Sequence, residues 1–410
     1  MNKSTSLSAS AASTASKLSA EICIVGNGAI AKTTALGLAN AGLKVILLGP
    51  PAPLVAPPAE TGWDARVYAL NHTAHRLLSS LKVWGALDAA RVTPVDAMIV
   101  QGDGAAPGAL AFDAYGAHTD TLAWILEERN LNQALDAALR FAQNVTIVGG
   151  RATALLRGDD HATVTLADGG SIEAQLVVGA DGAESWVRGQ CDIGLDYRSY
   201  GQRGVVSNFA CEKPHHGAAH QWFTGEQGIV ALLPLPGNQV SLVWSAPDAL
   251  ADTLRAESAQ QIADRLAVYA SEKLGALTPL QPELVRDFPL RLIRPHAMTS
   301  PRVALVGDAA HVVHPMAGHG MNLGFGDVAQ LIETLADREP QRGVGDARVL
   351  ARYERARKED VLLMQVTTDG LARLFGADIE PLRVVRNLGL NLLDKIPVLK
   401  RRLISHAMGK

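Results

Sequence analysis

The stretch from Val303 to Asp327 constrains the fold of this chain most strongly, because strand, turn and helix signals follow one another within it. Its apolar start, Val303–Val306, predicts a strand buried on both faces of a parallel sheet. Asp308 follows just beyond this strand. Because ligands bind at the carboxyl ends of parallel strands, Asp308 is placed to accept hydrogen bonds from a sugar or polyol.

The remainder of the same stretch predicts a sharp turn followed by a helix. Pro315, Gly318 and Gly320 interrupt the chain, and apolar residues then recur at helical spacing over Met321–Leu335. A helix that begins near Gly320 would direct its free backbone N–H groups and the positive end of its dipole towards the ligand. For each glycine taken singly, a purely structural turn is the alternative interpretation.

The amino-terminal part predicts a second ligand-binding turn of the βαβ type. Strand patterns at Glu21–Val25 and Lys44–Leu48 flank a glycine-rich turn and a helix over Lys32–Ala41. In this GxGxxA pattern, Gly26 permits the tight turn, Gly28 lets the backbone approach a pyrophosphate, and Ala31 packs the helix on the strand. The pattern therefore predicts dinucleotide binding.

One position departs from the dinucleotide pattern. An acidic residue is expected at the end of the second strand, where it binds the adenosine ribose, but Gly49 occupies this position. Either backbone groups or another side chain bind the ribose, or nucleotide affinity is lower. A glutamate in place of Gly49 is expected to tighten binding by accepting two ribose hydroxyls.

Length and composition bound the class of protein. A chain of 410 residues with 48% hydrophobic content can bury a core large enough for two or three domains. The net charge of −3 and the lack of a basic run with interleaved aromatic residues argue against nucleic acid. The three cysteines, Cys23, Cys191 and Cys211, lie far apart, as expected for reduced core thiols in the cytoplasm.

The two ends of the chain carry different signals. Residues 1–20 are rich in Ser, Ala and Thr, which predicts a disordered tail, with an organelle transit segment as the alternative. From Arg348 the chain is helical and increasingly basic. Such a segment can lie on an anionic membrane surface, or it can pack on the body of the protein.

Between these ends, the patterns predict both helices and an antiparallel sheet. An amphipathic helix is expected after Asp64–Leu70 and a long helix over Thr121–Leu139. Strands are expected at Met98–Gln101 and Leu110–Phe112, and alternating apolar residues between 189 and 289 predict further short strands. The histidines at 215, 216 and 220 are poorly spaced for a metal site, so no metal is expected.

Three strings together resemble the single-component flavoprotein aromatic hydroxylases, in particular their ubiquinone-biosynthesis branch. They are GxGxxA from Gly26, GADGxxSxVR from Gly179, and GDAAHxxxPxxGxGxNxG from Gly307, and the resemblance extends from about residue 21 to 409. It implies an α/β fold like that of p-hydroxybenzoate hydroxylase. In this fold an FAD-binding Rossmann-like domain carries an inserted antiparallel-sheet substrate domain and a carboxyl-terminal helical segment.

The resemblance also implies domain boundaries. Residues 1–20 would be the tail. The FAD-binding domain would comprise residues 21–95, 120–188 and 290–345, the substrate domain residues 96–119 and 189–289, and the carboxyl-terminal helices residues 346–410.

By resemblance, Asp308 contacts the ribityl chain, and Arg66 lies against the flavin or its phosphates. Arg129 either reaches the flavin or pairs with Glu127. Asp181, Gly182, Ser185 and Arg188 take the pyrophosphate and NAD(P)H roles, and His319 stands where the branch has Gln. The full set of implied cofactor residues is Gly26, Gly28, Ala31, Arg66, Arg129, Asp181, Gly182, Gly307, Asp308, Pro315, Gly318, His319, Gly320, Met321, Asn322 and Leu323.

The implied function is FAD-dependent hydroxylation of the aromatic ring of a polyprenylated phenol in ubiquinone biosynthesis, with NAD(P)H and O₂ as co-substrates. Because the flavin performs the chemistry, no catalytic side chain is expected. The expected partners are a ubiquinone-biosynthesis complex and, through the carboxyl-terminal helices, the inner membrane. A flavin-deficient accessory protein that binds a prenylated lipid or sister enzymes, and a hydroxylase of soluble phenols, are the alternatives.

Overall fold

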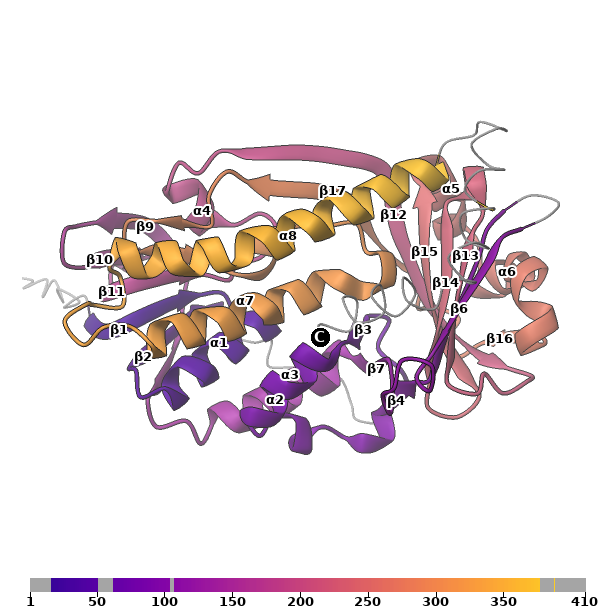
Figure 1. The fold of residues 1–410 in the computed structure, drawn as a ribbon, viewed down its shortest axis with the longest axis horizontal. Coiled ribbons are helices and arrows are strands. Elements are labelled where there is room, and N and C mark those ends of the chain that lie inside the picture. Colours follow the sequence, from indigo (N-terminus) through magenta and orange to yellow (C-terminus); the bar gives the residue numbers. More distant parts are fainter. Residues whose placement is uncertain (1–15, 51–61, 104–106, 377–386, 388–410) are drawn as a thin grey trace, which may run out of the picture.

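The computed structural model describes residues 16–50, 62–103, 107–376 and Asn387. Within these ranges two large sheets lie towards opposite ends of the molecule, and the long helix α8 (Ala347–Gly376) runs from one towards the other (Figure 1). The smaller helices and strands between the two sheets position the candidate site.

The first sheet is built on buried apolar strands. Its order is β18-β19-β11-β1-β2-β8, and β19, β11, β1, β2 and β8 run parallel. Helix α1 (Ala29–Asn40) packs against α7 (His319–Ala336), which in turn packs against α8. The strands are β1 (Lys17–Val25), β2 (Val45–Gly49), β8 (Val145–Gly149), β11 (Ser171–Gly179), β18 (Thr299–Ser300) and β19 (Val303–Leu305).

An antiparallel ribbon extends this sheet. It consists of β9 (Ala152–Arg157) and β10 (Ala162–Leu166), and β10 pairs with β11. In the turn from β10 to β11, Gly169 has a φ of 87° and donates its N–H to the Leu166 carbonyl. The short helix α4 (Trp186–Gln190) follows β11.

The second sheet is largely antiparallel, as the alternating pattern predicted, with order β16-β12-β15-β14-β13-β5-β6 and β17 paired to β12. Helices α5 (Asp248–Ala256) and α6 (Ala259–Leu274) contribute Leu254, Ile262 and Leu266 to a core shared with Trp222 and Trp244. The strands are β5 (Ala97–Gln101), β6 (Ala109–Asp113), β12 (Leu195–Cys211), β13 (Ala218–Phe223), β14 (Ile229–Leu235), β15 (Gln239–Pro247), β16 (Leu277–Pro279) and β17 (Arg286–Pro295).

The predicted helix over Thr121–Leu139 is wrong in its first part. Ala123–Glu127 is strand β7, which pairs with β3 (Val67–Leu70) on one side and β4 (Val92–Val95) on the other. Only Glu128–Leu139 is helical, as α3. Pairing on both sides satisfies the backbone of β7 and buries Ile125 and Leu126, which overrides a periodicity that fitted a helix.

The amphipathic helix predicted after Asp64–Leu70 is present as α2 (His72–Ser80). It follows β3, and the Asn71 side chain caps its start by accepting a hydrogen bond from the Ala74 N–H. Short 3₁₀ turns follow at Trp84–Ala86 and Ala89–Arg91, and another lies at Gly225–Gln227.

The predicted tail ends earlier than residue 20. Lys17–Ala20 belongs to β1 and pairs in register with β11, and the Lys17 ammonium lies 2.8 Å from Glu173. Residues 1–15 of the predicted tail lie outside the described residues.

Strand pairing follows the expected grouping of segments. β5 and β6 join the sheet that is otherwise built from residues 195–295. They do so even though strands of the first sheet lie between them and those residues in the sequence. We propose the predicted domain division on this basis. The carboxyl-terminal helices predicted after Gly376 lie outside the described residues, apart from Asn387.

Candidate active site

The three glycine-containing loops meet at one edge of the first sheet. β1, β11 and β19 are parallel neighbours, so the loops after Val25, Gly179 and Leu305 leave the sheet at the same edge. This is the edge at which parallel sheets bind ligands. The register of the parallel strands therefore brings the three loops together.

The turn after β1 fits a dinucleotide pyrophosphate. Gly26 has a φ of 133°, and a Cβ there would overlap the Ala180 carbonyl, so only glycine is accommodated. Gly28 begins α1 without a side-chain cap, and a Cβ at this position would meet nothing within 4 Å. The free N–H groups at the start of α1 therefore face open space, while Ala31 is fully buried in its packing role.

Gly49 is packed closely against the same turn. A Cβ at this position would lie 2.8 Å from the Asn27 Cβ and 3.2 Å from the Gly26 carbonyl carbon and oxygen. The missing acidic residue thus coincides with a close approach of β2 to the pyrophosphate turn. This contact reverses the expectation that a glutamate here would tighten nucleotide binding.

The loop after β11 uses its polar side chains for structure. The Asp181 carboxylate accepts hydrogen bonds from Ser185 Oγ at 2.5 Å and the Val187 N–H at 3.0 Å, while Ser185 Oγ accepts from the Arg188 N–H. These bonds cap the start of α4. Gly182, with a φ of 82° and open space at its Cβ position, offers backbone rather than side-chain contacts.

Arg188 ties two of the loops together. Its guanidinium donates to the Ala183 carbonyl at 2.8 Å and to the Ala309 carbonyl at 3.0 Å. Burial lowers the pKa of Arg188, which the nearby carboxylates of Asp181 and Glu184 partly offset. The side chain is committed to positioning these loops.

A buried ionic network lies beneath the loop after β19. The Asp327 carboxylate, which has no exposed surface, accepts from the Gly307 N–H at 2.9 Å and from Arg357 Nε at 2.8 Å. His311 Nε2 lies 2.6 Å from the same carboxylate. Burial alone would raise the pKa of Asp327, but His311 and Arg357 hold it below its ordinary value. Sequence reasoning did not assign this residue.

Asp308 is directed into the cavity rather than into this network. It lies in a 3₁₀ turn, Gly307–Ala309, and lines the large cavity of the molecule. Surrounding protein raises the pKa of the Asp308 carboxyl, and His311, Arg66 and Arg291 oppose that effect. The position and the nearby cations fit a carboxylate that binds hydroxyl groups.

The turn before α7 brings backbone close to the cavity. A 3₁₀ turn at Met316–Gly318 ends with Gly318 at a φ of 67°, and α7 starts at His319. The side chain of His319 lies outside the described part of the structure. Five of the predicted residues of this turn and helix start line the cavity: Pro315, Gly318, Gly320, Met321 and Asn322.

Asn322 and Leu323 contribute in ways that the sequence did not indicate. Asn322 donates to the carbonyls of Ala69 and Gly318 and accepts from the Asn71 N–H, so it joins α7 to the chain between β3 and α2. Leu323 packs in a small apolar cluster with Val313 and Met364 and does not line the cavity.

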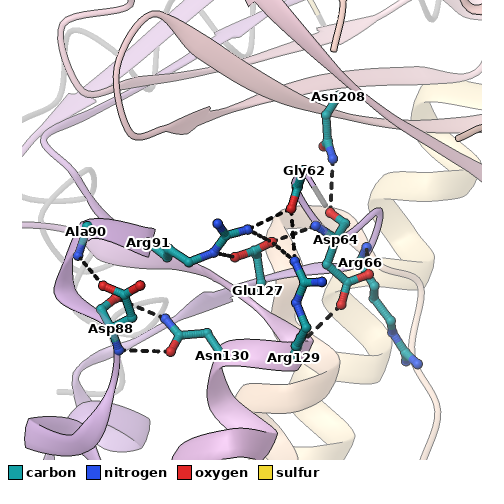
Figure 2. Close-up of polar contacts among 10 residues, drawn as sticks. All are labelled: Gly62, Asp64, Arg66, Asp88, Ala90, Arg91, Glu127, Arg129, Asn130 and Asn208. Carbon is teal, nitrogen blue, oxygen red and sulfur yellow. Dashed lines mark hydrogen bonds and ion pairs between the residues drawn. The ribbon is translucent and has the colours of Figure 1, made fainter. Parts of the chain in front are cut away.

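The segment from Gly62 to Asn71, which forms another cavity wall, is held by a buried carboxylate (Figure 2). Glu127, fully buried, binds Arg91 through both oxygens at 2.5 and 2.7 Å and accepts from the Asp64 N–H at 2.6 Å. Arg129 lies 3.5 Å from Glu127 and donates to the Gly62 carbonyl at 2.9 Å.

The two predicted arginines therefore differ. Arg129 lines the cavity and also pairs with Glu127, so the two interpretations of this residue are compatible. Arg66 also lines the cavity, and its partly exposed side chain lies 3.6 Å from Glu128. Burial opposes the Arg66 charge, but Tyr68, Glu128 and Asp308 outweigh this and raise its pKa.

All these walls enclose one cavity of about 1440 Å³. Its first-sheet side carries charged groups, including Asp308, Arg66 and Arg129. Its opposite wall, from β5, β6, β13, β14 and β15, carries no Asp, Glu, Lys or Arg among the described lining residues. Arg286, Asp287 and Arg291 of β17 also line the cavity, so the apolar wall stands beside charged surfaces.

The histidines do not form a metal site. No group of three or more possible metal ligands occurs among the described residues. His215 Nε2 lies 2.8 Å from the carbonyls of Leu235 and Gly237. His220 stacks on Trp222, and burial lowers the pKa of His220 to about 4, so its ring is neutral at pH 7.

This fold and site define a flavoprotein monooxygenase. Residues 19–365 match the FAD binding domain family. The chain is 37% identical over 395 residues to the ubiquinone hydroxylase UbiL of Rhodospirillum rubrum, with 95% of this chain and 90% of that protein covered. It is also 37% identical over 398 residues to the 3-demethoxyubiquinol 3-hydroxylase of Escherichia coli, with 95% and 98% covered.

The fold agrees with a solved structure. The crystal structure of PqsL, a probable FAD-dependent monooxygenase from Pseudomonas aeruginosa, has a TM-score of 0.74 and 22% identity, covering 91% of this chain and 99% of that one. The chain therefore belongs to the ubiquinone-biosynthesis flavin hydroxylase family, whose members are FAD-dependent oxidoreductases.

Replacement of Asp327 by Asn should destabilise the protein by about 3–5 kcal/mol, because it leaves Arg357 buried without its counter-charge. The free energy of unfolding in urea measures this. Asp360→Asn, which alters the exposed partner of the same arginine, should cost no more than about 1 kcal/mol. Because the pKa of Asp327 is lowered in the folded protein, the carboxylate stabilises the fold above about pH 4 and this stabilisation is lost in acid. The free energies of unfolding of the wild type and Asp327→Asn should therefore converge at low pH. Equal losses for both variants at neutral pH would contradict the assignment.

Replacement of Gly49 by Ala or Glu should weaken FAD binding about tenfold, because the added Cβ displaces the Gly26-Asn27 turn. Titration of the apoprotein with FAD measures this. Gly85→Ala, at a glycine with open space around it, is the matched control and should leave affinity unchanged. Tighter binding by Gly49→Glu would restore the original expectation.

Replacement of Asp308 by Ala should strip FAD from the purified protein. The charge-assisted hydrogen bonds to a ribityl chain are worth on the order of 1.5–3 kcal/mol. Asp308→Asn keeps an acceptor and should retain intermediate affinity. Wild-type flavin content in the alanine variant would rule out this role.

Proposed function

We propose that this protein hydroxylates the aromatic ring of a polyprenylated phenol or quinol in ubiquinone biosynthesis, using FAD, NAD(P)H and O₂. The observation that carries the proposal is the single cavity that joins the Asp308 loop to an apolar sheet wall. A flavin held by the loop and a ring held by the wall would share one water-poor space. The two bacterial relatives, a ubiquinone hydroxylase and a 3-demethoxyubiquinol 3-hydroxylase, support the same reaction class.

The residues present fit FAD. The start of α1 beside Gly28 would hold the pyrophosphate, Asp308 the ribityl chain, and the backbone between Gly318 and Asn322 the ring system. When bound, FAD supplies electron transfer from NAD(P)H and the activation of O₂. The other implied cofactor residues stay in this proposal as positioning groups.

The protein's own contribution is position and dryness. Met98, Val100, Phe112 and Phe223 supply apolar surface on the wall opposite Asp308. Such a wall excludes water from the ring and itself carries no cation that would bind a substrate carboxylate, although Arg286 and Arg291 of β17 line the same cavity. It therefore favours a neutral phenol or quinol over an aromatic acid.

The size of the cavity favours a substrate with an apolar tail. At about 1440 Å³ it exceeds the 300–1,000 Å³ typical of small-molecule pockets, so space remains for a substrate after the flavin ring takes its part. Residues of α8, including Thr367 and Leu371, line its side. The tail would extend along this helix.

The reaction can be tested with purified protein. Protein loaded with FAD, given NADH or NADPH under air, should add one oxygen atom to 2-prenylphenol, as detected by mass spectrometry. Absence of a flavin spectrum after FAD addition would favour the flavin-deficient accessory protein. Tightly coupled hydroxylation of unprenylated phenol alone would favour the soluble-phenol hydroxylase. Deletion of the gene should then show which quinone precursor accumulates.

We also propose that the protein takes its substrate at a membrane surface. A long isoprenoid tail is nearly insoluble in water, so the ring must come from a bilayer or a lipid-binding partner. No described helix has the length and apolar character needed to cross a bilayer. Surface contact is supported instead by Leu362, Leu363 and Val366, which are solvent-exposed on α8. Membership of a ubiquinone-biosynthesis complex and a cytoplasmic, inner-membrane location belong to the same proposal.

The sequence after α8 is rich in positive charge. Basic residues at 383, 386, 395 and 400–402 are interleaved with Leu, Val and Ile. Each basic residue near an anionic surface contributes about 1 kcal/mol, screened by salt.

The full-length protein should therefore sediment with anionic vesicles at low salt and be released at high salt. Truncation before Leu382 should abolish sedimentation and leave bound flavin in place, as read from flavin absorbance. Neutral vesicles are the control. Equal sedimentation of both forms would exclude this segment as the membrane contact, and insoluble or flavin-free truncated protein would indicate that the segment packs on the body.

A further inference from the structure

The apolar cavity wall contains a buried amide. Ala219, Gln221 and Phe223 of β13 line the cavity. His220 also borders it, but the His220 ring stacks on Trp222, which belongs to the core beneath α6. Strand alternation thus directs the Gln221 side chain towards the cavity. Its residue is only 6% exposed.

The immediate neighbours of Gln221 are apolar. In the register of the sheet it lies beside Val100 of β5 on one side and Ala231 of β14 on the other, and Ala231 is followed by Val243 of β15. Because Ala231 is small, space is left next to the amide. The amide therefore stands alone in the middle of an apolar row.

This amide makes no hydrogen bond to any described residue. By contrast, the amide of Gln101 on β5 is used structurally, since it accepts from Trp222 Nε1 at 2.6 Å. Buried polar side chains are normally paired, and a glutamine offers both an acceptor and two donors. An unpaired amide directed into a cavity indicates that a ligand supplies the partner.

Chemistry supplies a reason for such a group. An apolar wall binds a ring without fixing its rotation, yet hydroxylation at one ring carbon requires one orientation towards the flavin. One directional hydrogen bond to a ring oxygen removes that freedom. We propose that Gln221 binds an oxygen substituent of the substrate ring and thereby determines which ring carbon is hydroxylated. This assignment rests on the proposed hydroxylase function.

Other polar groups near the wall are weaker candidates. Asn208 on β12 donates its amide to the Asp64 carbonyl at 3.0 Å. Ser245 on β15 lines the cavity in the next row, beside Ile229, and its shorter side chain reaches less far from the sheet. Ser245 is therefore the alternative residue for a hydrogen bond to the ring oxygen.

The test uses flavin-loaded protein and a pair of probes, 2-prenylphenol and prenylbenzene, which differ only in the ring hydroxyl. Binding is read from the change in flavin absorbance. Gln221→Met keeps the side-chain volume and removes the amide. It should weaken 2-prenylphenol binding about tenfold and leave prenylbenzene binding unchanged. The same substitution at the exposed Gln260 of α6 is the matched control and should change neither.

The product gives a second readout that a purely structural role would not move. Wild type should form one hydroxylated isomer from 2-prenylphenol, and Gln221→Met should form a mixture. If the methionine variant loses its flavin, Gln221→Asn, which withdraws the amide by one methylene, serves for the same measurements.

Three outcomes would overturn the assignment. The first is equal weakening for both probes. The second is a loss specific to the hydroxyl in Ser245→Ala but not in Gln221→Met. In the third, wild-type protein neither binds nor hydroxylates 2-prenylphenol, and this alone would also overturn the proposed function.

Discussion

The buried carboxylate of Asp327 is the interaction on which the cofactor edge of this molecule depends. A charge without solvent contact is stable only where hydrogen-bond donors and opposite charges replace its hydration. Here those groups come from Gly307 and His311 in the loop after β19 and from Arg357 on α8. Meeting this electrostatic requirement therefore sets the loop, α7 and α8 in one arrangement.

A second buried carboxylate does the same for the facing wall. Glu127 binds Arg91 and Arg129 and accepts a hydrogen bond from the Asp64 N–H (Figure 2). These contacts fix the segment around Asp64 that lines the cavity. The positions of the charged residues on this side of the cavity are thus set by buried carboxylates that lie behind the cavity wall. The apolar side is set by strand register instead, and its only directional groups are uncharged.

Local patterns in the sequence predicted much of this. The glycine-rich turns and the apolar strands before them depend on neighbouring residues, so the three fingerprints could be placed and the orientation of Asp308 towards a ligand inferred. Asp327 could not be assigned, since its partner Arg357 is on another helix. The burial of Leu323 likewise follows from tertiary contacts, whereas the hydrogen bonds of Asp181 to Ser185 and Val187 are local and cap a helix.

The error over Thr121–Leu139 has the same origin. Apolar spacing there fits a helix as well as a strand followed by a helix, and only the partners β3 and β4 decide between them. Gln221 was overlooked because both faces of β13 are buried, so the sequence of this strand does not indicate which face lines a cavity. Whether a buried face meets a core or a cavity is decided by elements elsewhere in the chain.

The pairing of distant strands also has a consequence for how the chain is made. Ala97 of β5 lies opposite Ala218 of β13. β1 pairs with the distant strand β11, which in turn pairs with β19. During synthesis these early strands are exposed before their partners emerge, and pairings so distant in sequence form slowly. Neither sheet can close early. The nucleotide edge and the substrate wall therefore come into existence together, late in folding, and FAD can stabilise only chains in which α7 has already been made.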